Sequence, residues 1–182
     1  MKKVIAALTS MALVIALAGC SASGSGQNQQ SESPSDKMTE EELRFTDRDL
    51  DPSYDEASAT KIVLDGSGAS VTGEGATADG STVTISADGT YVVSGTLADG
   101  QIVVSLPGDE DKAQIVLDGV TIHNEDGPAI QVDQADKVFL TLADGSTNTL
   151  SDGTDYALAE GEDEPYAALY SKDDLTLSLI HI

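Results

Sequence analysis

Short runs of β-branched residues, separated by Asp-Gly pairs, fill the chain from Lys61 onward. The Asp-Gly pairs begin at residues 65, 79, 88, 99, 118, 126, 144 and 152. Short runs rich in valine, isoleucine and threonine are typical of strands. Glycine after aspartate marks a turn, because glycine adopts positive φ without strain. No helical period appears in this region, so we predict an all-β domain over residues 61–182.

Two architectures fit these runs. Asp-Gly between strands is a hairpin signal, which predicts an antiparallel β-sandwich. The runs also recur as triplets that begin near residues 62, 83, 115, 138 and 175. Acidic insertions at 107–112 and 151–165 account for the longer spacings, and such repeats predict a solenoid. We therefore favour a right-handed parallel β-helix over the sandwich.

The interior of such a coil is expected to hold the apolar residues that alternate along each strand. These are Ile62, Leu64, Val83, Ile85, Ile115, Leu117, Ile122, Ile130, Val132, Leu140, Leu142, Leu150, Leu169, Leu175 and Leu177.

The N-terminal end carries an export signal. Two lysines precede an apolar run that ends at Ala18 and is shorter than the roughly 18 residues of a membrane span. Residues 1–19 are therefore predicted to be a signal peptide. The next residue completes the phrase Leu-Ala-Gly-Cys20, which resembles the bacterial lipobox. The resemblance implies a lipidated Cys20 that holds the protein on the extracellular side of the cell membrane, whereas an ordinary signal peptide with a chance cysteine is the alternative.

Residues 20–60 are rich in serine, glycine, glutamine and acidic residues, with no apolar period. Such a segment buries too little apolar surface to offset its ordering entropy, so we predict a disordered linker. The net charge of −23 argues against a nucleic-acid partner, because the chain repels phosphate. Cys20 is the only cysteine of the 182 residues, which excludes an internal disulfide framework.

Four longer phrases carry a resemblance to a known family. They are ADGTYVVSGTLADGQIVVSL (87–106), IVLDGVTIHNEDGPAIQV (115–132), KVFLTLADGSTNTLSDG (137–153) and the run AALYSKDDLT (167–176). The chain resembles secreted clostridial-type carbohydrate-binding proteins with a parallel β-helix. The resemblance implies binding of plant cell-wall polysaccharide, pectin or cellulose, with calcium in the structure and a pectate-lyase-like fold that is not a lyase in function. The last residues, 178–182, depart from the family pattern, and we expect the chain to be a C-terminally truncated fragment.

A catalytic role is not expected. Proton abstraction beside a uronate carboxylate needs a cationic base and further cations, yet residues 61–182 hold no arginine and four lysines. We predict a non-catalytic binding domain. The alternatives are a structural surface protein or adhesin, and a calcium-dependent polysaccharide lyase or hydrolase.

Carboxylates at successive corners of a β-helix can supply the oxygen ligands that calcium takes. The candidate ligands are Glu125, Asp126, Asp133 and Asp136 on one rung and Asp152, Asp155 and Asp174 on the next. The alternative is that these residues only solvate the coil and form turns. Sugars stack on exposed aromatic rings, and Tyr156 and Tyr166 flank the long insertion. These two tyrosines are therefore the predicted carbohydrate contacts.

Overall fold

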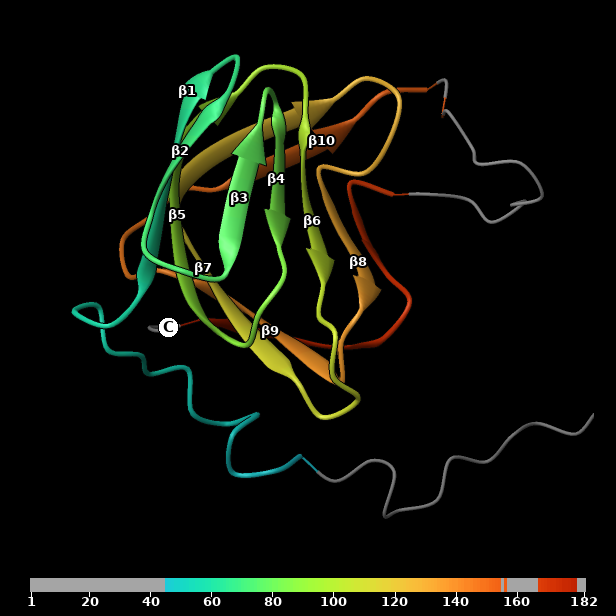
Figure 1. Ribbon diagram of the computed structural model, residues 1–182. Coiled ribbons are helices and arrows are strands. Elements are labelled where there is room, and N and C mark those ends of the chain that lie inside the picture. Colours follow the sequence, from blue (N-terminus) through green and yellow to red (C-terminus); the bar gives the residue numbers. More distant parts are fainter. Residues whose placement is uncertain (1–44, 155, 157–166, 180–182) are drawn as a thin grey trace, which may run out of the picture. The chain divides into compact units, whose positions relative to one another are not determined.

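The β-branched runs form strands in the computed structural model, which describes residues 45–154, 156 and 167–179 (Figure 1). These residues contain no helix, and therefore none that is long and apolar enough to cross a membrane. The strands are β1 (Thr60–Gly66), β2 (Ala69–Thr72), β3 (Ala76–Asp79), β4 (Thr82–Ile85), β5 (Gly89–Leu97), β6 (Gln101–Ser105), β7 (Lys112–Asn124), β8 (Ile130–Gln134), β9 (Lys137–Leu142), β10 (Thr149–Asp152), β11 (Leu169–Ser171) and β12 (Asp174–Leu179).

Successive coils of the chain stack strand upon strand in parallel. The larger sheet has the order β12-β9-β7-β5-β1, and its register aligns Tyr91 with Ile115 and Ile115 with Leu140. The smaller sheet has the order β11-β8-β6-β4, and it aligns Ile102 with Ile130. Parallel neighbours separated by a whole coil cannot arise from sequential hairpins. The predicted parallel β-helix is therefore confirmed, and the sandwich alternative is wrong.

A third side is made by strands that bend from one side of the coil to the next. The first half of β7 pairs with β9, and its second half pairs with β10. The bend lies at Gly119, where φ is +72°, and a register shift marks the same place in β5 between Val93 and Gly95. Asp118-Gly119, predicted as a turn between strands, is thus a bend inside one continuous strand.

The first coil is covered by two antiparallel strands. β2 pairs antiparallel with β1, and β3 pairs antiparallel with β4, so residues 69–79 flank both sheets at this end. The predicted start of the second rung near residue 83 is wrong: Val93, not Val83, lies beside Ile62. Val83, on β4, belongs to the smaller sheet and pairs with Ile102, because the covering strands β2 and β3 lie between β1 and β4 in the chain.

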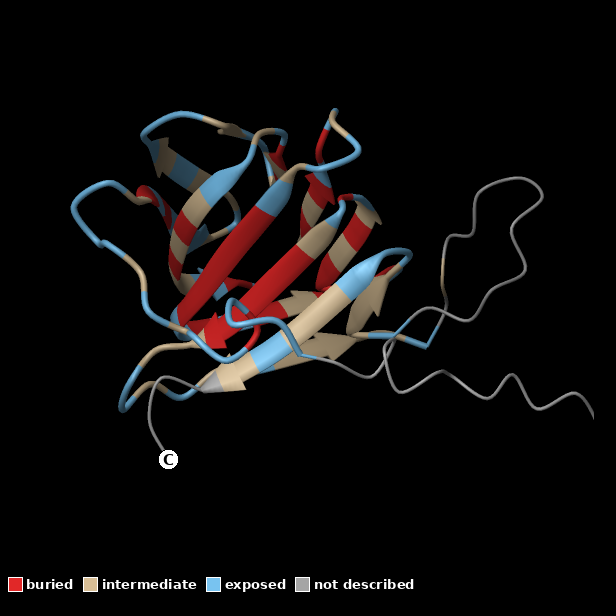
Figure 2. Ribbon diagram, turned by 90° about the horizontal axis from the view of Figure 1, so that it is seen from below, coloured by how far each residue is buried: buried red, intermediate tan, exposed pale blue. Residues whose placement is uncertain are grey.

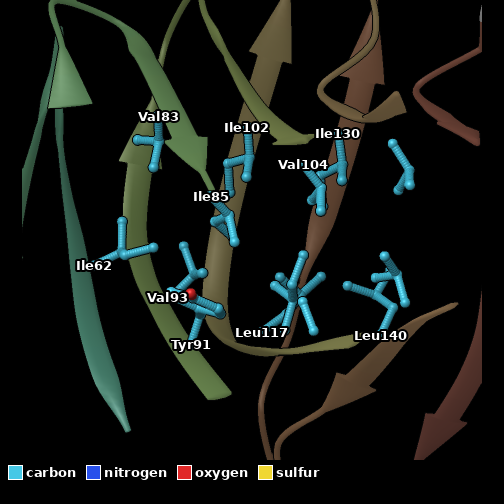
Figure 3. Close-up of a cluster of buried hydrophobic side chains, with 14 of the residues drawn as sticks. Ile62, Val83, Ile85, Tyr91, Val93, Ile102, Val104, Leu117, Ile130 and Leu140 are labelled. Atoms are coloured by element: carbon cyan, nitrogen blue, oxygen red, sulfur yellow. The ribbon is translucent and has the colours of Figure 1, made fainter. Parts of the chain in front are cut away.

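The inward side chains form one apolar core between the sheets (Figure 3). Of the residues predicted to face inward, ten are buried: Ile62, Leu64, Val83, Ile85, Ile115, Leu117, Ile122, Ile130, Val132 and Leu140. Four more at the far end of the coil are partly buried and pack against the core: Leu142, Leu150, Leu169 and Leu175.

Leu177 is the exception, since 64% of it is exposed. It is aligned with buried Leu140 and lies on the same side of the sheet. Among the described residues β9 is its one strand neighbour in that sheet, so nothing there covers the outer side of β12. Figure 2 shows this decline, from red central strands to the tan and pale blue β12. Leu177 therefore lies on the predicted inward side of the sheet, but it is not buried.

Candidate functional site

The outer face of the larger sheet gathers lysines. Lys61, Lys112 and Lys137 alternate along β1, β7 and β9 with the inward residues Ile62, Ala113 and Val138. Lys112 and Lys137 are direct neighbours in the register. Three of the four lysines that follow residue 60 therefore share one face of a strongly acidic chain.

A segment preceding β1, which we call the N-terminal strap (residues 45–59), contacts this face. The Asp49 carboxylate lies 2.6 Å from the Lys137 ammonium and accepts a 2.6 Å hydrogen bond from the Thr176 hydroxyl. It also accepts hydrogen bonds from the amide and hydroxyl of Thr46. Asp49 is 7% exposed. The Lys137 ammonium and the Thr176 hydroxyl hold the pKa of the Asp49 carboxyl well below its usual range.

Gln114 of β7 forms the second contact with the strap. Its amide oxygen accepts a 2.7 Å hydrogen bond from Arg48, and its amide nitrogen donates to the carbonyl of Pro52 at 3.0 Å. The Arg48 guanidinium lies 4.8 Å from the centre of the Phe139 ring, within cation–π range. Gln114 and Phe139 point outward and are nevertheless buried, because the strap lies over them.

The strap differs from the disordered linker predicted for residues 20–60. Its described residues have too few apolar side chains to build a core, and that observation motivated the prediction. The contacts that order it are polar instead, and they join residues far apart in the chain, such as Asp49 and Thr176. The strap ends at β1, where Glu56 pairs with Lys61 at 2.9 Å between exposed side chains. Glu56 raises the pKa of Lys61.

An acidic hollow of about 580 Å³ lies where the smaller sheet passes into the larger one. Its lining includes Asp109, Asp136 and Asp173, from the turns that precede β7, β9 and β12, and Asp174, the first residue of β12. Asp136 pairs with Lys112 and raises the pKa of that lysine, and Asp173 accepts a hydrogen bond from the amide of Ala135. Two predicted calcium ligands, Asp136 and Asp174, thus share this hollow.

Asp133 lies at the end of β8 just before that turn, and its carboxylate faces Lys172 at 3.5 Å and the Gln131 amide at 2.8 Å. It does not line the hollow. Both contacts are made by Oδ1 of Asp133.

A different corner holds Glu125, Asp126 and Asp152, where β7 and β10 end. Glu125 accepts from His123 at 3.1 Å, and Asp152 accepts a hydrogen bond from the Tyr156 hydroxyl. Asp155 lies outside the described residues. The predicted ligands are therefore divided between two corners of the coil. Within the described part of the chain, no three acidic, histidine or cysteine side chains are grouped as a metal site.

The predicted sugar-stacking residues are only partly described. Tyr156 is half-buried, and its hydroxyl is bonded to Asp152, which raises the pKa of the tyrosine. Tyr166 lies outside the described residues. Tyr170, on β11, is half-buried and aligned with Gln131 of β8. Tyr91 is buried in the core and donates a 2.6 Å hydrogen bond to the carbonyl of Ala87.

Sequence reasoning missed the lysine face and the strap. One signal for the face was available, because Lys112 and Lys137 each begin an alternating apolar run and therefore occupy equivalent places in successive coils. No comparable signal marks the strap, whose contacts depend on which side chains the finished coil brings together.

Comparisons with known proteins agree on the kind of domain. A family model described as "Carbohydrate-binding domain-containing protein" matches residues 79–178, which include strands of every side of the coil. A curated relative of the same description, from Acetivibrio thermocellus, is 38% identical over 96 residues. That alignment covers 52% of this chain and 33% of the relative.

A solved structure gives the same indication of the fold. It is described as the polysaccharide lyase-like protein from C. thermocellum, in a gadolinium derivative. The TM-score is 0.63 at 37% identity, and the match covers 66% of this chain and 49% of that one. The chain thus spans a third of the curated relative and about half of the solved structure.

Proposed function

Because this chain belongs to the family of carbohydrate-binding domain-containing proteins, we propose that its β-helix binds plant cell-wall polysaccharide, pectic or cellulosic, without cleaving it. The observation that carries the proposal is the extent of the family match. Residues 79–178 span the coil from the end of β3 into β12, so the similarity concerns most of the stacked strands rather than one loop.

The state of the lysines supports binding rather than elimination chemistry. A lyase base must be neutral to remove a proton, and a lysine achieves this through a lowered pKa. In this domain the pKa values of Lys61 and Lys112 are raised by Glu56 and Asp136. Both side chains are therefore ammonium groups at neutral pH, suited to hold a carboxylate and unsuited to act as a base.

Calcium is part of the proposal for an acidic polysaccharide. The protein and a polyuronate are both anionic, so shared divalent ions would relieve their repulsion. The hollow beside Asp136 and Asp174 offers the hard oxygen donors that calcium takes. Since the described residues group no three such donors, carboxylates of the polysaccharide would complete the coordination.

Attachment to the cell is the remaining part of the proposal. Cys20 follows an export segment and would carry the lipid anchor, with residues 21–44 as a spacer before the strap. The domain would then present its polysaccharide surface on the extracellular side of the membrane.

The test is affinity electrophoresis of the purified protein in gels with polygalacturonate, with dextran or with no polymer, alongside a pull-down on cellulose. We expect retardation by polygalacturonate or retention on cellulose, and no retardation by dextran. Polygalacturonate retardation should disappear with EDTA, whereas equal retardation would contradict the calcium role. Release of unsaturated uronide would show a lyase, and a protein that binds neither polymer would contradict the proposed function.

A further inference from the structure

The strap covers the lysine face with its own acidic residues. Asp49 contacts Lys137 of β9, and Glu56 contacts Lys61 of β1. Between these two ion pairs, the carbonyl of Pro52 accepts from Gln114 of β7. The order of the contacts along the strap therefore follows the order of the strands, from β9 and β12 back to β1. An acidic chain crosses the parallel strands of the sheet, with a carboxylate bound near each end.

The face beneath the strap has the groups that hold an acidic sugar chain. It provides the ammonium groups of Lys61 and Lys137, the Thr176 hydroxyl and the Gln114 amide. Ammonium and hydroxyl donors bind carboxylates, and amides bind hydroxyl groups. The ring of Phe139 lies under the Arg48 guanidinium, which occupies the place where a sugar ring would stack. A hollow of about 210 Å³ remains beside Arg48, Lys112 and Phe139.

We propose that the outer face of β1, β7, β9 and β12 is a binding surface for a polyuronate chain, and that the strap occupies this surface until the polysaccharide displaces it. The Asp49 and Glu56 carboxylates take the places of two uronate carboxylates. This inference rests on the proposed function, and it names both the surface and the ligand class within it.

The composition of the strap makes such an exchange feasible. Its large apolar side chains, Phe45 and Leu50, are 73% and 69% exposed, so they do not anchor it in the core. The strap is held by hydrogen bonds, by ion pairs and by the contact of Arg48 with Phe139. The carboxylates and hydroxyl groups of an acidic polysaccharide can replace the hydrogen bonds and ion pairs, and a sugar ring can replace the guanidinium on Phe139. Replacing one set of polar partners by another changes the free energy of the folded protein little, whereas leaving buried polar groups without partners destabilises it.

The first test compares Asp49→Ala with Asp47→Ala. Both variants remove one negative charge from the strap, so both reduce the electrostatic repulsion of a polyanion equally. Exposed Asp47, however, makes none of the contacts with the sheet described above. If the open strap is populated at about 0.1–10%, releasing it raises the apparent affinity roughly 10- to 1000-fold. We expect at least a tenfold gain in polygalacturonate affinity for Asp49→Ala, with calcium in every sample, and little change for Asp47→Ala. Equal affinities of the two variants would overturn the inference.

The second test uses the unaltered protein and hydrogen exchange of peptides from residues 45–54. Binding that displaces the strap must, by linkage, speed exchange in those residues. We expect polygalacturonate to speed exchange in these peptides and dextran to leave their exchange rate unchanged. In a separate affinity measurement, Lys137→Gln in the Asp49→Ala background should reverse the gain in polygalacturonate affinity. Polygalacturonate binding with unchanged strap exchange would refute this surface and leave the proposed function standing. Failure of every variant to bind any polysaccharide would refute both.

Discussion

Leu140 and Leu177 make a matched pair for testing where the core of the coil ends. They are aligned on β9 and β12 and lie on the same side of the sheet. Leu140 is 2% exposed and Leu177 is 64% exposed. Replacing a buried leucine by alanine removes its transfer free energy and leaves a cavity, which costs about 2–5 kcal/mol. Full burial of a leucine contributes about 1.5–3 kcal/mol, so Leu177, with about a third of its surface covered, should lose less than about 1 kcal/mol.

Urea unfolding followed by far-ultraviolet circular dichroism would measure both losses. With an m value of about 2 kcal/mol/M, Leu140→Ala should lower the midpoint by roughly 1–2.5 M and Leu177→Ala by less than about 0.5 M. An unchanged m value would show that the unfolding reaction is the same for both variants. Equal midpoint losses would refute the reasoning, since they would mean that Leu177 is covered in solution as completely as Leu140.

Three further predictions concern a buried hydroxyl, a bend and a carboxylate. Tyr91→Phe should cost about 0.5–1.5 kcal/mol in the same urea assay, because the hydrogen bond from the tyrosine hydroxyl to the carbonyl of Ala87 is lost. Gly95→Ala should destabilise the fold more than Gly119→Ala; both glycines have positive φ, but a Cβ at Gly95 would meet the backbone of β1 and one at Gly119 meets open space. Because the pKa of Asp49 is depressed in the folded protein, its ionised carboxylate stabilises the folded state. This contribution is fully present above the ordinary aspartate pKa of about 3.9 and is lost as pH falls through the folded-state pKa. An NMR titration should therefore place the Asp49 midpoint well below the ordinary aspartate value, and a midpoint at that value would contradict the docked strap.

The strands could be predicted from the sequence, whereas their stacking could be predicted only in part. Runs such as Ile115-Val116-Leu117 indicate a strand by their residue types, and this feature is local. The register is not local. From the sequence, either Val83 or Val93 could align with Ile62. Val93 is the neighbour because the covering strands β2 and β3 precede the strand that carries Val83.

The candidate sites were less predictable because they depend on how the turns and the strap are placed. Asp136 and Glu125 are close in sequence, yet they lie at different corners, since a strand of the smaller sheet separates them. The strap was assigned to a linker because its composition is polar, and composition does not reveal that Asp49 would find Lys137 and Thr176. Polar ordering of this kind becomes visible only when the coil has placed its lysines on one face.

Calorimetric titration of the purified protein with oligogalacturonate, in buffer with calcium, tests the polysaccharide-binding role most directly. The proposed role predicts saturable heat with a defined stoichiometry for oligogalacturonate or, if the ligand is cellulosic, for a cello-oligosaccharide of equal length. A dextran oligosaccharide should give only heat of dilution. The absence of saturable heat with both plant-derived ligands would contradict the proposed role.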